Sequence, residues 1–384
     1  MKYCFDPDFR LGILGGGQLG KMLCQAASEW HLHTAVLDPD PDAPARAICT
    51  RFVQGDFRKT DDVLRFAEGL DLLTVEIESV DVAALDQLAA RGLAVHPAPQ
   101  TLALIQDKGL QKEFLVQHGL PTSQFELLAS SVEVRAAVAE GRRRLPFVQK
   151  LRCMGYDGRG VQRVANETEL DRLLEGPCLV EDWVDVRKEI AVIAARRASG
   201  EVQVFPAVEM VFHPTANLVE LLRSPADLPP KLADEARELA MQTIEAFGLS
   251  GLLAVEMFLD AQDRLWINEV APRPHNSGHH TLANSVTSQY EQHLRAILDL
   301  PLGATDALAH AAMVNLLGAE GYEGKPIYRG IEDCLRVPGC TLHIYGKPET
   351  RPFRKMGHAT IVGQDPEAVL SAAQQVRKTV KVIA

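Results

Sequence analysis

Two strand-like segments, each carrying one glutamate, are joined by a short polar turn, and their pairing constrains the fold more than any other feature. Residues 252–259 and 265–270 are aliphatic and aromatic with partial alternation, which is typical of strands. The polar residues between them predict a hairpin turn. A hairpin centred between residues 262 and 263 places Glu256 directly opposite Glu269. Like charges at opposed positions destabilise a ladder, because their Cβ atoms lie only about 5 Å apart.

Such a pair of carboxylates needs a counter-charge. A divalent cation with oxygen ligands supplies one, and Mg²⁺ usually brings substrate phosphates with it. Two solvated glutamates on a surface hairpin are the alternative. The segment that follows, residues 271–280, is dense in hydrogen-bond donors and poor in packing groups, which favours a binding site.

Length and composition limit the class of protein. A chain of 384 residues predicts two or three domains, and 46% hydrophobic with 24% charged residues is typical of a soluble globular protein. A net charge of −11 argues against a nucleic-acid partner. No apolar run approaches the ~20 residues of a membrane helix, and the acidic N-terminus does not resemble a signal peptide. Seven cysteines without a C-x-x-C pair indicate a reducing compartment, so we expect a cytoplasmic protein.

The N-terminal third opens with a βαβ pattern. A strand at 11–14 leads into Gly15–Gly20, which matches G-x-G-x-x-G, and a helix and a strand ending at Asp38 follow. Taken alone, this pattern indicates a nicotinamide dinucleotide enzyme. However, a tight turn between a strand and a helix needs glycines whatever binds there. The motif alone is therefore weak evidence.

Further short strands are predicted at residues 52–54, 72–77 and 93–95, with helices between them. This spacing predicts a doubly wound parallel sheet that ends near residue 100. Glu76 and Glu78 stand at the C-terminal end of one strand, where open α/β sheets bind ligands.

The middle of the chain resembles a nucleotide clamp. We predict one helix over residues 101–118 and a strand over 147–151 that contains Lys150. A glycine-rich loop flanked by cations follows at 155–161, and its backbone N–H groups could approach phosphates. Its spacing is not that of a Walker A loop, and a plain hairpin turn is the alternative. Strands are predicted at 178–184 and 188–195.

Several of these features occur in the order seen in the ATP-grasp superfamily: Lys108, Lys150, the loop 155–161, Glu181, Glu189 and the Glu256/Glu269 pair. More narrowly, the chain resembles the N5-carboxyaminoimidazole ribonucleotide synthases over about residues 10–365. The motifs that carry this resemblance are GGGQLG at 15–20, GYDGRG at 155–160, NEVAPRPHNSGH at 268–279, TSQYEQH at 287–293, and YGK at 345–347 with RKMGH at 354–358.

The resemblance implies a role for each matching residue. Glu256 and Glu269 would hold magnesium, and Arg159, Arg273 and Lys150 would be catalytic. The ATP-binding residues would be Lys108, Lys150, Gly155, Tyr156, Asp157, Gly158, Arg159, Gly160, Val161, Glu181, Asp182, Trp183, Val184, Glu189, His213, Asn268 and Glu269. Bicarbonate and aminoimidazole ribonucleotide would contact Glu76, Tyr156, Asp157, Arg159, Arg273, His275, Asn276, Ser277, Lys347, Arg354 and Lys355.

The expected fold is of mixed α/β and α+β class. It comprises a Rossmann-like, doubly wound domain at residues 1–100, a two-lobed ATP-grasp domain at 101–300 and a small β-rich C-terminal domain at 301–384. The resemblance implies a homodimer that carboxylates 5-aminoimidazole ribonucleotide with ATP, Mg²⁺ and bicarbonate, through carboxyphosphate, in purine biosynthesis. Three alternatives are a formate-dependent ATP-grasp enzyme, a nicotinamide-dependent oxidoreductase and a non-catalytic nucleotide sensor.

Overall fold

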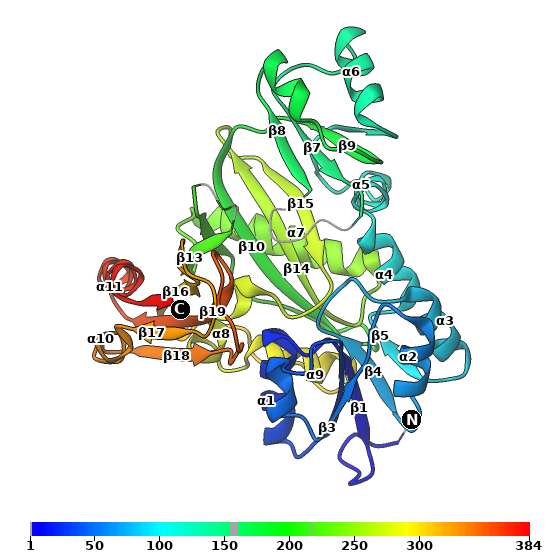
Figure 1. Ribbon diagram of the computed structural model, residues 1–384, viewed down its shortest axis with the longest axis vertical. Coiled ribbons are helices and arrows are strands. Elements are labelled where there is room, and N and C mark those ends of the chain that lie inside the picture. The colour runs from blue at the N-terminus through cyan, green and yellow to red at the C-terminus, as the bar shows by residue number, and fades with distance from the viewer. Residues whose placement is uncertain (1, 154–159, 215, 217) are drawn as a thin grey trace.

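The computed structural model describes residues 2–153, 160–214, 216 and 218–384. A parallel sheet lies at one end of the molecule, a small antiparallel sheet at the other, and a long antiparallel sheet between them (Figure 1). No helix in the described part of the chain is both long enough and apolar enough to cross a membrane.

The N-terminal sheet is parallel, with strand order β3-β2-β1-β4-β5, and helices cover it. Strands β1, β2 and β4 are largely buried, because βαβ crossovers place helices on the sheet faces. The predicted doubly wound arrangement is confirmed. The elements are β1 (Arg10–Leu14), α1 (Gln18–Glu29), β2 (His33–Asp38), a 3-10 turn (Pro44–Ala47), β3 (Arg51–Gln54), α2 (Thr60–Phe66), β4 (Leu72–Val75), α3 (Val82–Ala90) and β5 (Ala94–His96).

Two helices follow where one was predicted over 101–118, so that prediction is wrong. They are α4 (Pro99–Gln106) and α5 (Lys108–Gln117), and they are separated by Asp107 in an extended conformation. The Asp107 carboxylate accepts hydrogen bonds from the amides of Gly109 and Leu110 at 2.8 and 3.2 Å, which makes it the N-cap of α5. It also pairs with Arg152 at 2.7 Å. The ion pair with Arg152 favours the interruption between α4 and α5. The spacing of apolar residues along the chain does not reveal such a distant contact.

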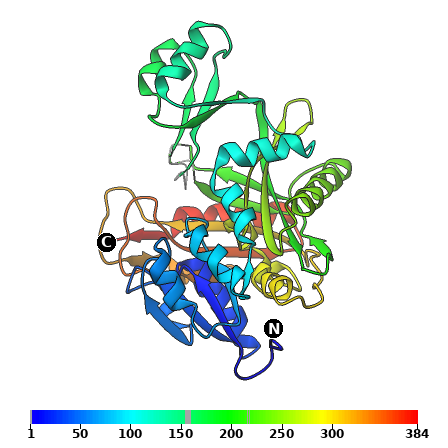
Figure 2. The ribbon, with the colours of Figure 1, turned by 90° about the vertical axis from the view of Figure 1, so that its right-hand side faces the viewer.

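A small antiparallel sheet forms the far lobe, in strand order β6-β9-β7-β8 (Figure 2). Phe147, Val180 and Val134 belong to its core, which is separate from the core of the long sheet. The elements are β6 (Phe125–Leu128), α6 (Ser131–Ala139), β7 (Phe147–Leu151), β8 (Val161–Val164), a 3-10 turn (Glu167–Arg172) and β9 (Cys178–Asp182).

The long sheet contains, in order, β15-β14-β10-β12-β13-β16-β19-β18, with β11 beside β10. Its last three strands come from beyond residue 300, and β16 pairs with β13 directly. The three-domain division stays a prediction. The elements are β10 (Val186–Arg196), β11 (Val202–Val204), β12 (Val208–Phe212), β13 (Val219–Ser224), α7 (Pro230–Phe247), β14 (Gly251–Asp260), β15 (Leu265–Ala271), a 3-10 turn (Asn276–Gly278), α8 (Thr281–Asn284), α9 (Gln289–Ile297), β16 (His310–Leu317), β17 (Ile327–Arg329), α10 (Ile331–Leu335), β18 (Cys340–Ile344), β19 (Lys355–Gly363), α11 (Pro366–Thr379) and β20 (Lys381–Ile383).

Candidate active site

Glu256 on β14 and Glu269 on β15 are direct partners across the hairpin, as predicted. The pairing nearer the turn differs from the predicted register by one residue, since Met257 pairs with Ile267. The register shifts between Glu256 and Met257, and Asn268 is the extra residue. The turn is centred half a residue earlier than predicted. The extra residue Asn268 restores the predicted pairing of Glu256 with Glu269.

The bulge at Asn268 aims two consecutive side chains at one cluster of cations. In a regular strand, successive side chains point to opposite faces, whereas a bulge re-aims one of them. Asn268 Oδ1 accepts a hydrogen bond from Lys150 Nζ at 2.7 Å, and Glu269 pairs with Lys108 Nζ. A local irregularity therefore places amide and carboxylate oxygens side by side.

The two opposed glutamates differ in charge because their neighbours differ. The ammonium of Lys108 lowers the pKa of Glu269 to about 2. Burial raises the pKa of Glu256 to about 8, and the charges of Glu269 and Glu189 add to this effect. His275 Nε2 lies 3.4 Å from Glu256 Oε1. Glu256 therefore keeps its proton at neutral pH. A cation bound between the two glutamates would favour its ionisation.

Lys112, Lys150 and Glu181 form a buried triad. Lys112 contacts one oxygen of the Glu181 carboxylate at 2.6 Å, and Lys150 contacts the other at 2.7 Å. Burial opposes ionisation of Glu181, but the two lysines outweigh it and lower its pKa to about 2. Lys112 is only 2% exposed, and the sequence analysis missed it. The available signal was its position one helical turn after Lys108 on α5.

Further predicted nucleotide residues lie on β9, on β10 and in the segment that joins these strands. Burial raises the pKa of Glu189, on β10, to about 7, although Lys150 acts in the opposite direction. Asp182 at the end of β9 pairs with Arg143 at 2.8 Å. Trp183 is exposed and has the guanidinium of Arg163 over its ring. Val184 lies in the connection from β9 to β10.

The segment after β15 joins this cluster to the N-terminal sheet. Arg273 pairs with Glu78 at 2.8 Å, across 195 residues of sequence. His275 Nδ1 lies 2.9 Å from Ser277 Oγ. Asn276 exchanges two hydrogen bonds of 2.9 Å with Asn315, a buried residue of β16 that the sequence analysis also missed. Asn315 is a polar residue within the otherwise apolar run 311–317, which was the available signal.

Three of the predicted substrate contacts, Lys347, Arg354 and Lys355, lie on the loop before β19 and at its start. Lys347 Nζ donates a hydrogen bond to the carbonyl of Lys355 at 2.8 Å, and Arg354 donates to the carbonyl of Glu349 at 2.7 Å. Burial lowers the pKa of Arg354, and the charge of Arg351 lowers it further. The ring of His213, another predicted ATP-binding residue, packs against the ring of Phe353, with centroids 5.2 Å apart.

Glu76 occupies the glycine loop of the N-terminal sheet. Its two carboxylate oxygens accept hydrogen bonds from the amides of Gly17 and Gly20 at 2.9 and 2.8 Å. A Cβ atom on Gly15, whose φ is +100°, would lie 2.5 Å from Glu76 Cγ, so the loop needs glycine there. In a dinucleotide enzyme these amides bind the pyrophosphate. Here a carboxylate of the chain takes that place, which disfavours the nicotinamide alternative.

Part of the predicted site lies outside the described residues, namely Gly155, Tyr156, Asp157, Gly158 and Arg159. The loop's last two predicted members are described. The Gly160 carbonyl accepts a hydrogen bond from the Leu151 amide at 2.8 Å. Val161 pairs with Lys150 across β7 and β8.

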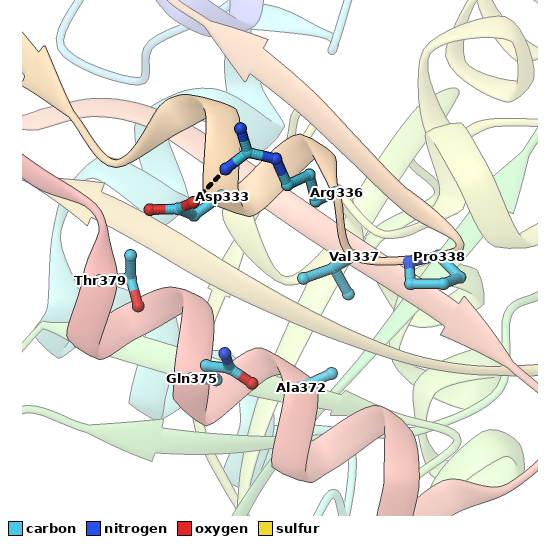
Figure 3. A pocket seen from close by; sticks show the side chains of 7 residues that line it. All are labelled: Asp333, Arg336, Val337, Pro338, Ala372, Gln375 and Thr379. Carbon is cyan, nitrogen blue, oxygen red and sulfur yellow. Dashed lines mark hydrogen bonds and ion pairs between the residues drawn. The ribbon is translucent and has the colours of Figure 1, made fainter.

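The oxygen donors fit a cation that arrives with part of its own ligand shell. Within the described ranges no group of three or more His, Cys, Asp or Glu side chains could hold a metal. Magnesium typically takes one or two carboxylates and completes its shell with water and phosphates. Glu256 and Glu269 match that pattern. A hollow of about 480 Å³ between α10 and α11 is lined by other residues (Figure 3). These two helices lie apart from the β14–β15 hairpin (Figure 1).

Comparisons with known proteins cover nearly the whole chain. Three family models match: the ribonucleotide synthetase preATP-grasp domain at residues 9–106, the ATP-grasp domain at 113–290 and the phosphoribosylaminoimidazole carboxylase C-terminal domain at 311–372. The N5-carboxyaminoimidazole ribonucleotide synthase of Bacillus subtilis is 37% identical over 94% of each chain. The chain spans about two thirds of the length of some relatives, such as 65% of the phosphoribosylaminoimidazole carboxylase of Vigna aconitifolia, at 37% identity.

Solved structures agree in fold. The N5-carboxyaminoimidazole ribonucleotide synthetase of Thermotoga maritima has a TM-score of 0.89 and 41% identity, and the match covers 98% of this chain and 99% of that one. An Aspergillus clavatus synthase in complex with ADP and 5-aminoimidazole ribonucleotide has a TM-score of 0.89 and 31% identity, with 97% and 99% covered. The opposed glutamates, the lysines beside them and these likenesses together lead to one conclusion: the chain belongs to the N5-carboxyaminoimidazole ribonucleotide synthase family of ATP-grasp ligases.

Proposed function

We propose that this protein carboxylates 5-aminoimidazole ribonucleotide, using ATP and bicarbonate and releasing ADP and phosphate. The observation that carries the proposal is that the Glu256/Glu269 pair lies between two sets of groups. Lys108 contacts Glu269 and Lys150 contacts the neighbouring Asn268, whereas His275, from the segment containing Arg273, approaches Glu256. The Aspergillus clavatus relative, whose structure holds ADP with the ribonucleotide, supports the same assignment.

In the first step a bicarbonate oxygen attacks the terminal phosphorus of ATP, and ADP leaves. Phosphoryl transfer depends mostly on positioning and on neutralising charge. Lys108 and Lys150 would hold the phosphates, and Glu189, Asn268 and residues 181–184 would bind the rest of the nucleotide. A bound divalent cation supplies charge neutralisation at the phosphates, and Glu256 with Glu269 would hold magnesium there.

In the second step the exocyclic amine of the ribonucleotide attacks the carbonyl carbon of carboxyphosphate and phosphate leaves, or it attacks CO₂ formed after phosphate has left. The amine nitrogen loses a proton, and the carbamate forms. Arg273 and Arg159 suit bicarbonate, because a guanidinium fork matches a planar oxyanion. Lys347, Arg354 and Lys355 suit the 5-phosphate of the ribonucleotide. Asn276 is held by Asn315, which would fix the acceptor loop around His275 and Ser277.

Phosphate release measured with ATP, Mg²⁺, bicarbonate and the ribonucleotide tests the proposal. Release should require the ribonucleotide and bicarbonate, and formate should not replace bicarbonate. A formate-dependent release would favour the related ligase, and release that ignores the ribonucleotide would overturn the proposal. The homodimer and the cytoplasmic location stay predictions; sedimentation velocity measures the former.

A further inference from the structure

We propose that Lys112 is a positioning residue with two roles. It shares the charge of Glu181, so that Lys150 keeps a net positive charge for the phosphates of ATP. It also holds the bulged strand β15 in place. This inference rests on the proposed function, since it assigns ATP to the site of Lys150. Lys112 itself is buried within the protein and acts through the groups that it contacts.

Lys112 and Lys150 contact different oxygens of the Glu181 carboxylate. Lys112 Nζ contacts Glu181 Oε1 at 2.6 Å and Ser123 Oγ at 3.1 Å, and it also donates to Thr122. Ser123 in turn donates to the same Glu181 oxygen at 2.9 Å. Lys150 takes the other oxygen, Oε2, at 2.7 Å. Both oxygens of one carboxylate are thereby occupied by separate lysines.

The charges of the triad determine how strongly Lys150 attracts a phosphate. A buried charge is tolerated when it is paired, and removing one partner of a buried pair is costly. With one lysine, Glu181 would neutralise Lys150 and leave little attraction for a phosphate. With Lys112 present, the triad carries two positive charges and one negative. The surplus lies on Lys150, which also contacts Asn268 beside the glutamate pair.

Lys112 also contacts the backbone beside the bulge. Lys112 Nζ lies 3.4 Å from the carbonyl oxygen of Ile267, the residue before Asn268. Thr122 Oγ1 donates to the same carbonyl at 2.7 Å. One helix residue therefore ties α5 to the strand that aims Asn268 and Glu269. Its own side chain, 3% exposed, does not need to touch the nucleotide.

Equilibrium dialysis with Mg·ATP, without ribonucleotide, tests the inference on the full chain. In Lys112→Met, Glu181 would neutralise Lys150, and the charge-assisted contact of Lys150 with the phosphates would be lost. ATP binding should therefore weaken about tenfold. The discriminating variant is Lys112→Met combined with Glu181→Gln. Because it removes the triad's only negative charge, Lys150 is again positive, and the double variant should bind ATP more tightly than Lys112→Met alone. If Lys112 had only a structural role, the losses of ATP affinity caused by Lys112→Met and by Glu181→Gln would add in the double variant.

Arg377→Met is the matched control, because it breaks an ion pair with Glu220 at 2.7 Å on the C-terminal helix α11, away from α5. ATP binding should not change in that variant. If Lys112→Met does not fold in a thermal unfolding assay, Lys112→Gln carries the same comparison. Unchanged ATP binding in the Lys112 variant, or a double variant weaker than both single ones, overturns this inference alone. Wild-type protein that binds no ATP overturns the proposed function along with it.

Discussion

Replacing Glu256 with glutamine should stabilise the unliganded protein at neutral and alkaline pH. Burial, with help from Glu269 and Glu189, raises the pKa of Glu256 to about 8 in the folded state. In the unfolded chain a glutamate has a pKa of about 4.3. The folded state therefore binds this proton more tightly, so the stability it contributes is complete below about pH 4.3 and is lost as the pH rises towards about 8.

The magnitude follows from the size of that shift. One pKa unit corresponds to about 1.4 kcal/mol, so the interval from about 4.3 to pH 7 sets an upper limit of roughly 3–4 kcal/mol. Relaxation around the 16%-exposed side chain of Glu256 reduces it, and we expect a gain of about 1–3 kcal/mol in the Glu256→Gln variant at pH 7. Glutamine keeps the shape of the protonated acid but cannot ionise.

Urea unfolding in the presence of a chelator, at pH 5 and pH 8, measures this effect. The midpoint of Glu256→Gln should exceed that of wild type at pH 8, and the difference should shrink at pH 5. Glu220→Gln, which alters a glutamate paired with Arg377 away from the hairpin, is the control and should show no such gain. An equal loss of stability in Glu256→Gln at both pH values would refute the reasoning. The same variant should lose the stabilisation that Mg·ATP gives to wild type.

Three further predictions concern the neighbouring residues. Glu269→Gln should abolish phosphate release while far-UV circular dichroism stays unchanged, because the variant lacks the carboxylate that faces Glu256; near-full turnover would contradict the metal-binding role. Asn268→Ala should lower kcat/KM for ATP about tenfold, because Lys150 loses one of its two contacts, with Asn268 and Glu181. Steady-state kinetics with varied ATP measures this change. A change confined to the KM for the ribonucleotide would argue against it. Asn315→Leu should lower the free energy of unfolding by about 1–3 kcal/mol, because it leaves the amide of Asn276 without its partner; urea unfolding measures this loss, and a variant as stable as wild type would contradict it.

Local patterns predicted the parallel sheet, the small lobe's β7 strand and the glutamate hairpin. The signals were the two-residue period of the strands, buried apolar runs and turn residues, all of which act over a few positions. The pairing of Glu256 with Glu269 was predicted correctly, although the turn is centred half a residue earlier than expected. The register returned to the predicted one only because of the bulge at Asn268.

The helix predicted over 101–118 shows where local patterns fail. Asp107 interrupts it, and the group that holds Asp107 in place is Arg152, 45 positions later. The glycine motif at 15–20 is a second case. Its pattern matches a dinucleotide loop, yet the carboxylate of Glu76, 56 residues after Gly20, takes up its amides. In both cases the deciding partner is distant in sequence.

The sequence alone determined the fold class, the family and the two opposed carboxylates, because strand period, turn chemistry and motif order are written along the chain. Only the tertiary structure decided how those carboxylates are charged. Lys108 approaches Glu269 across 161 residues, and Lys112 with Lys150 encloses Glu181 from two different elements. A pKa depends on burial and on charges within a few ångströms. Those neighbours exist only once helix α5, the small lobe and the hairpin have packed together.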